Sequence, residues 1–80
     1  MDDQPKFERL RQTCSATLHL FITEAQKTEA HVQQLNIPVS LVESRRLSIQ
    51  RRVENVAHEN YVLASMQLHD FLRQYLYIVN

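Results

Sequence analysis

Residues 36–43, NIPVSLVE, divide the chain into two parts. Pro38 cannot continue a helix, and it also pushes the residue before it out of helical geometry. Ser40 and Glu43 then follow the S-x-x-E pattern of a capping box, in which the hydroxyl and the carboxylate each satisfy a free backbone N–H. The stretch therefore predicts the end of one helix, a short turn over residues 36–40, and a second helix directly after it.

The segment before the turn repeats its core-facing positions at steps of three or four, which is the spacing of one face of an α-helix. Asp2 and Asp3 suit the positive N-terminal end of such a helix, and Pro5 is tolerated in its first turn. We therefore expect a first helix over about residues 4–35. Its predicted packing face consists of Phe7, Leu10, Cys14, Leu18, Phe21, Ala25, Thr28, Val32 and Leu35.

The segment after the turn carries a similar stripe and predicts a second helix over about residues 41–79. No proline or glycine interrupts it, and the whole chain has no glycine and only two prolines. Because several strands would need several turns, this composition argues against a β fold. The stripe consists of Val42, Ile49, Val53, Val56, Asn60, Ala64, Leu68, Phe71, Tyr75 and Ile78.

A five-residue connection between two long helices predicts an antiparallel hairpin, so we expect residues 1–80 to form one all-α domain. Two residues that face one another across the hairpin then have numbers that add up to about 77. In this register Phe21 meets Val56, and Phe7 meets Phe71. The second helix continues about two turns beyond the start of the first.

The C-terminal half of the second helix is apolar around most of its circumference. A helix of this kind is normally buried on more than one side, and a two-helix hairpin covers only one. We therefore expect self-association, most simply a homodimer that forms a four-helix bundle, and docking of a partner such as another helical protein. The predicted partner surface consists of Tyr61, Leu72, Tyr75, Leu76, Ile78 and Val79.

Four of the nine basic residues cluster early in the second helix, at Arg45, Arg46, Arg51 and Arg52. On a helical wheel they point in three directions, whereas tracking of phosphates along a groove requires one stripe. The hairpin register places Glu29 near Arg45, so an ion pair between the helices is expected. It places Glu24 near Arg52 in the same way. A small nucleic-acid-binding dimer that uses this arginine cluster remains the alternative function.

No set of residues has the spacing of a catalytic, cofactor or metal site. Cys14 lies on the packing face and is expected to be a small buried group. The four histidines do not converge within one hairpin, and the chain has no glycine for a phosphate-binding loop. We therefore expect a non-enzymatic protein–protein interaction module, such as a small helical adaptor, regulator or co-chaperone.

Charge and hydropathy argue against a membrane protein. Nine acidic and nine basic residues give no net charge, and no apolar run approaches the roughly 20 residues of a membrane span. The N-terminus is acidic where a secretion signal would be basic and then apolar, and a lone cysteine suits a reducing compartment. The expected location is the cytoplasm.

Overall fold

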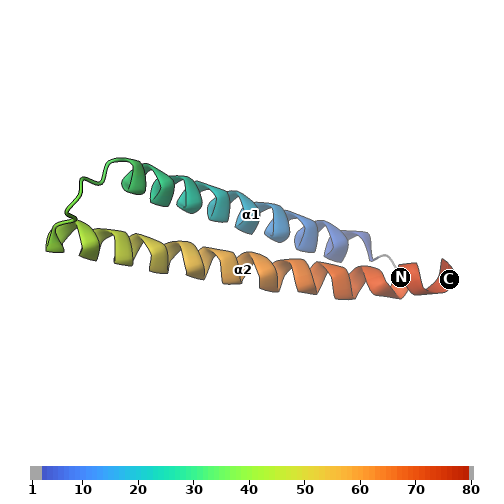
Figure 1. The fold of residues 1–80 in the computed structure, drawn as a ribbon. Coiled ribbons are helices and arrows are strands. Elements are labelled where there is room, and N and C mark those ends of the chain that lie inside the picture. The colour runs from blue at the N-terminus through green and yellow to red at the C-terminus, as the bar shows by residue number, and fades with distance from the viewer. Residues whose placement is uncertain (1–2, 80) are drawn as a thin grey trace.

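A computed structural model describes the backbone of residues 3–79 and the side chains of residues 3–75. It consists of helix α1, Gln4–Gln33, and helix α2, Leu41–Val79. The two helices lie side by side and run in opposite directions (Figure 1). The predicted all-α hairpin is confirmed. It is long and thin, with principal extents of 60 × 24 × 15 Å.

The turn carries the hydroxyl half of the predicted capping box. The Ser40 hydroxyl accepts a hydrogen bond from the Glu43 backbone N–H at 3.1 Å, which satisfies one of the free donors at the start of α2. At the other side of the turn, α1 ends two residues earlier than expected. Its last turn tightens there, because Gln34 N–H donates to the carbonyl of His31 and Leu35 N–H to that of Val32, each at 3.2 Å.

Aromatic contacts fix the register at the open end of the hairpin. The rings of Phe7 and Phe71 stack with centroids 6.4 Å apart, as predicted. The Tyr75 hydroxyl donates a hydrogen bond to the carboxylate of Asp3. The start of α1 therefore lies opposite Tyr75, and α2 continues past it to Val79, an overhang of about one turn rather than two.

The face of α2 that packs on α1 differs from the prediction in the first half of the helix. Phe21 contacts the rings of His58 and Tyr61, at centroid distances of 4.8 and 6.4 Å, while its predicted partner Val56 is 52% exposed. Because α2 is one continuous helix, the contact of Tyr61 with Phe21 turns Ala57 inward and leaves Val56, about 100° around the helix, exposed. The expected packing positions Val42, Ile49, Val53, Val56 and Asn60 are therefore wrong, whereas Ala64, Leu68 and Phe71 are confirmed.

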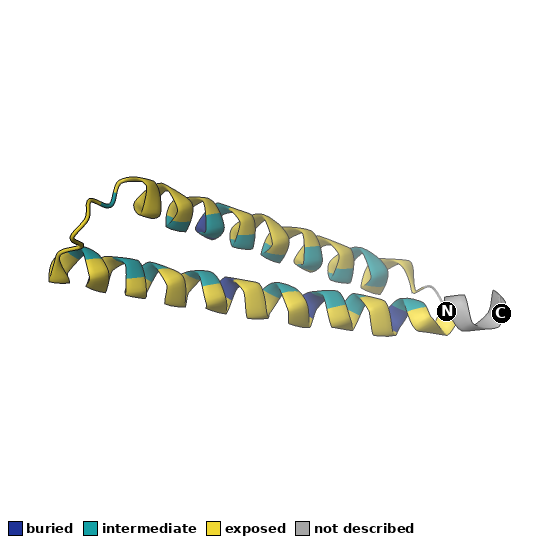
Figure 2. Cartoon of the chain, viewed as in Figure 1, coloured by how far each residue is buried: buried dark blue, intermediate teal, exposed yellow. Residues whose placement is uncertain are grey.

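The core of the hairpin is thin. Ala57, Ala64 and Phe71 are the buried apolar residues within the described side chains, and Glu24 is the buried charged one. Figure 2 shows these residues in a narrow strip between the helices, while most of both helices is exposed. A two-helix hairpin therefore leaves much of its apolar side-chain surface in contact with water.

Candidate functional site

Exposed apolar side chains form a line along one edge of α2. Four of them follow one another at steps of seven residues, and a fifth lies between the second and third. Their exposed fractions lie between 45% and 61%. Spacing of seven is the repeat that keeps side chains on one side of a helix that packs against another helix. We call these residues, Val42, Ile49, Val53, Val56 and Leu63, the α2 ridge.

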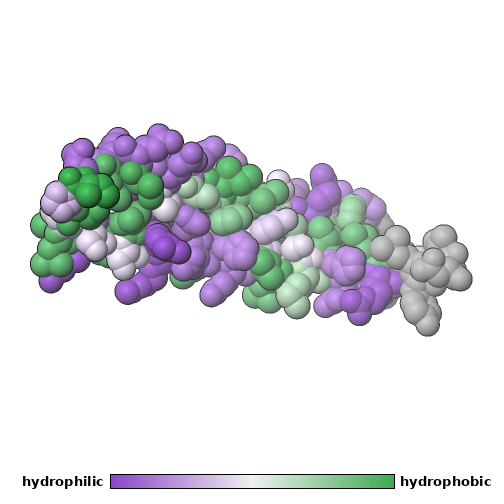
Figure 3. Space-filling model, viewed as in Figure 1, coloured by the Kyte–Doolittle hydropathy of each residue, from purple (hydrophilic) through white to green (hydrophobic). Residues whose placement is uncertain are grey.

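A groove between the two helices borders the α2 ridge. It has a volume of about 380 Å³, and Ile49, Val53 and Val56 form one of its walls. Leu20 forms the α1 side and is itself half exposed. Apolar side chains therefore reach the surface of both helices and are not confined to the space between them, as the hydropathy of the molecular surface illustrates (Figure 3).

A buried carboxylate lies at the base of this groove. Glu24 accepts a hydrogen bond from the Gln50 amide at 2.9 Å and pairs with the Lys27 ammonium at 3.1 Å. The bond from Gln50, and then that from Lys27, lowers the pKa of Glu24 below its ordinary value. The same Gln50 amide also bonds to the Glu24 backbone carbonyl at 3.1 Å. Glu24 is therefore ionised and fully bonded at neutral pH, and it holds the two helices in one register.

The predicted partner surface at the end of α2 is smaller than expected. Tyr61 and Leu72 are half-buried, and Tyr61 packs against Phe21 of the same chain. Tyr75 is 43% exposed, with its ring 5.6 Å from that of Phe71. That this region binds a partner stays a prediction. The remaining residues of the predicted surface, Leu76, Ile78 and Val79, have side chains outside the described part of the chain.

The four arginines of the cluster early in α2 are exposed and have no ion pair or hydrogen bond within residues 3–75. Arg73, further along α2, pairs with Asp70 at 3.4 Å. The expected pair of Arg52 with Glu24 is wrong, because Lys27 and Gln50 occupy that carboxylate. The expected pair of Arg45 with Glu29 is also wrong, since Glu29 accepts the Gln33 amide at 3.3 Å. All four cationic groups, those of Arg45, Arg46, Arg51 and Arg52, are therefore available to another molecule.

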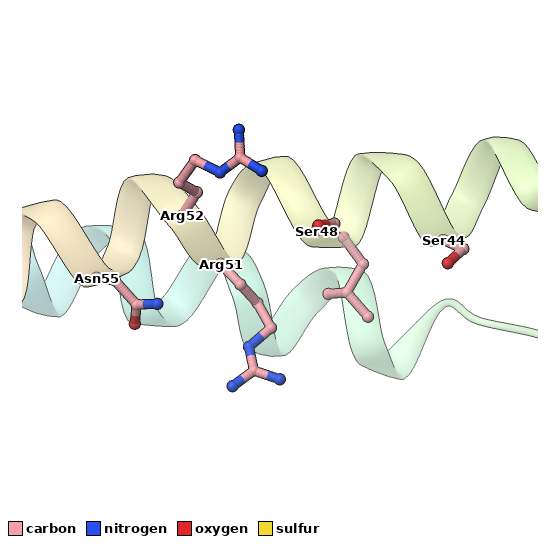
Figure 4. A pocket seen from close by; sticks show the side chains of 6 residues that line it. Ser44, Ser48, Arg51, Arg52 and Asn55 are labelled. Carbon is pink, nitrogen blue, oxygen red and sulfur yellow. The ribbon is translucent and has the colours of Figure 1, made fainter.

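One polar depression lies beside this arginine cluster. It has a volume of about 430 Å³ and is lined by one apolar residue, Leu47, and by five polar or charged residues, Ser44, Ser48, Arg51, Arg52 and Asn55. In the close view the side chains of Arg51 and Arg52 leave α2 on different sides (Figure 4). The depression therefore offers hydroxyl and amide groups, but it does not bring the two guanidinium groups together on one anion.

Known proteins provide no analogy for these surfaces. No protein family, no curated protein and no solved structure matches the chain. Within the described residues, no three histidine, cysteine or carboxylate side chains are grouped to hold a metal ion. Neither helix, as far as it is described, is long and apolar enough to cross a membrane.

Sequence reasoning missed the α2 ridge as an exposed surface because it assigned every member of the ridge except Leu63 to the face that packs on α1. The signal was present in the spacing. Val42, Ile49, Val56 and Leu63 repeat at seven, while Ala57, Ala64 and Phe71 follow a second line one residue further along. Two adjacent lines of this kind form an apolar stripe that is wider than the strip buried against α1.

Proposed function

We propose that this chain is a non-enzymatic protein–protein interaction module, of the small helical adaptor, regulator or co-chaperone type, and that it self-associates. The simplest assembly is a homodimer in which two hairpins form a four-helix bundle. The cytoplasm is the proposed location, where the single thiol of Cys14 stays reduced.

The amount of exposed surface carries this proposal. The chain exposes 6648 Å². A compact monomer of its mass, 9.5 kDa, exposes about 5,000 Å², so the excess is roughly 1,600 Å². A stable protein–protein interface buries about 800 Å² on each partner. The excess is therefore large enough for a dimer interface, and the exposed ridge and groove supply the apolar side chains that such an interface needs.

The mass of the chain in solution tests self-association. We expect sedimentation velocity and light scattering to give twice 9.5 kDa at about 100 μM, with dissociation on dilution. A mass of 9.5 kDa at every concentration contradicts the proposal.

Partner docking at the end of α2 is tested separately with Leu72→Glu, which places a charge on the predicted partner surface. If the Leu72→Glu variant has the same oligomeric mass in solution as the unmodified chain but no longer binds a helical partner, the end of α2 has a separate docking role.

The second candidate function is binding of nucleic acid by the arginine cluster. The observation that favours it is that Arg45, Arg46, Arg51 and Arg52 have no carboxylate partner within residues 3–75. A gel-shift titration with RNA and DNA at about 50 mM salt tests this function, because phosphate contacts weaken steeply as salt rises. Absence of any complex at low salt contradicts it. Equal binding by the chain and by a variant with all four arginines changed to glutamine contradicts it as well.

A further inference from the structure

We infer that the α2 ridge is the contact surface between two copies of this chain, and that the two α2 helices run antiparallel with Val53 opposite Val56 of the second copy. This inference rests on the proposed self-association and names the surface and the orientation that produce it. It differs from the surface predicted at the end of α2.

The sequence around the ridge has the spacing of a coiled-coil seam, with one apolar line and a second line in which Val53 is apolar. In such a seam, positions three and four residues apart alternate along one face and pack into the facing helix. Arg46 and Asn60 are the polar members of these lines, and polar residues at such positions lower the stability of the contact. The first line consists of Val42, Ile49, Val56 and Leu63, and the second of Arg46, Val53 and Asn60.

Charge decides between parallel and antiparallel arrangements. Four of the five α2 arginines lie in the half of the helix next to the turn, so a parallel dimer places both clusters at the same end. Arg46 then lies beside Arg46 of the second copy, where like charges repel. An antiparallel dimer places the clusters at opposite ends. Arg46 then lies opposite Leu63 of the second copy, where its stem packs on the leucine and its guanidinium stays in water.

The antiparallel register also supplies one pair of opposite charges on each side of its centre. Arg52 and Glu59 are seven residues apart and flank the α2 ridge on the same side. Both are exposed, and neither has an ion pair within the described residues. With Val53 opposite Val56, each Arg52 lies beside Glu59 of the second copy. A parallel dimer instead places Arg52 beside Ala57, which carries no charge.

The groove lies at the centre of this interface. Val53 and Val56, the residues on either side of the dimer centre, form its α2 wall, and Leu20 reaches the same level from α1. The second copy therefore covers the ridge and the apolar part of the groove together. Both helices of each hairpin then contribute to the contact, as a four-helix bundle requires.

Substitution of Val56→Glu tests the surface. Val56 is half exposed in the single chain, so the helical hairpin is retained and its circular dichroism at low concentration stays unchanged. In the dimer the carboxylate is buried without a partner, and we expect self-association to weaken at least about 100-fold. Val62→Glu is the matched control, since Val62 is an exposed valine on the other side of α2. Its dissociation constant should change less than about threefold.

A charge exchange tests the orientation. The R52E chain carries glutamate at both positions, and the E59R chain carries arginine at both. Each variant alone replaces two attractive pairs by two repulsive ones, and we expect about tenfold weaker self-association. A 1:1 mixture restores both attractive pairs, so a heterodimer forms with the affinity of the unmodified chain. The R52E/E59R double variant also regains that affinity.

The outcomes separate this inference from the proposed function. A monomeric unmodified chain overturns both. A dimer that survives Val56→Glu, or that Val62→Glu dissociates, overturns the inferred surface and leaves self-association in place. The antiparallel register is overturned if Val56→Glu dissociates the dimer but a 1:1 mixture of the R52E and E59R chains does not regain the affinity of the unmodified chain.

Discussion

At the scale of single residues, Glu24 and Gln50 define how the two helices fit together. A buried carboxylate is tolerated here because the Gln50 amide and the Lys27 ammonium both bond to it. The Gln50 amide also bonds to the Glu24 backbone carbonyl, so a shift of one residue between the helices breaks several bonds at once. The thin apolar core permits sliding, and this polar contact opposes it.

The stability of the hairpin should depend on pH through Glu24. Its pKa is lowered in the folded chain from its ordinary value of 4.5, chiefly by the bond from Gln50. This contribution is therefore fully present above about pH 4.5 and is lost as the pH falls through the lower folded pKa. We expect Glu24→Gln to lower the free energy of unfolding at pH 7 and to reduce its fall at acid pH. Urea unfolding at pH 7 and at pH 3 measures both effects.

Glu29→Gln is the matched control for this experiment, since Glu29 is exposed and bonds to an amide on its own helix. It should leave the free energy of unfolding nearly unchanged. An equal effect of the two substitutions at both pH values would show that the buried carboxylate has no special role.

At the scale of helices and turn, local sequence was sufficient. Pro38 and the Ser40 cap separate α1 from α2, and the spacing of apolar residues predicted both helices within two residues at each end. The rotation of α2 was not predicted. Two apolar lines overlap in the middle of α2, and the contacts of Phe21 with Tyr61 and of Gln50 with Glu24 select which line faces α1.

Loss of the Ser40 cap should destabilise the start of α2. Ser40→Ala removes the acceptor of the Glu43 N–H, and we expect a loss of about 1 kcal/mol in the free energy of unfolding. Ser48→Ala, at an exposed position within the same helix, should change the free energy by less than about 0.5 kcal/mol. Chemical denaturation of the three chains at one concentration provides the comparison. Equal stability of the Ser40 variant and the unmodified chain would argue against the cap.

At the scale of the whole molecule, shape is the dominant fact. The hairpin is 60 Å long but only 15 Å thick, and its described core contains one large apolar side chain, Phe71. A small chain with so thin a core is marginally stable alone, because buried apolar area must offset the conformational entropy lost by every residue that becomes ordered. The proposed assembly with a second copy supplies further apolar area to bury.

Thermal stability should therefore rise with concentration. If the folded chain is dimeric, dilution favours the unfolded state by mass action. We expect the unfolding midpoint followed by circular dichroism to increase by several degrees between about 5 and 200 μM. Val56→Glu should abolish this dependence. A midpoint independent of concentration in the unmodified chain would identify the hairpin as self-sufficient.

The sequence by itself determined the two helices, the turn and its cap, the antiparallel pairing and the contact of Phe7 with Phe71. These features follow from backbone geometry and from spacing along one chain, which local residues specify. The tertiary structure decided which of two apolar lines on α2 is covered and which is the exposed α2 ridge. That choice depends on the fit of Phe21, Tyr61, Glu24 and Gln50 between the helices, and packing and hydrogen bonding across an interface are not encoded in the periodicity of either helix alone.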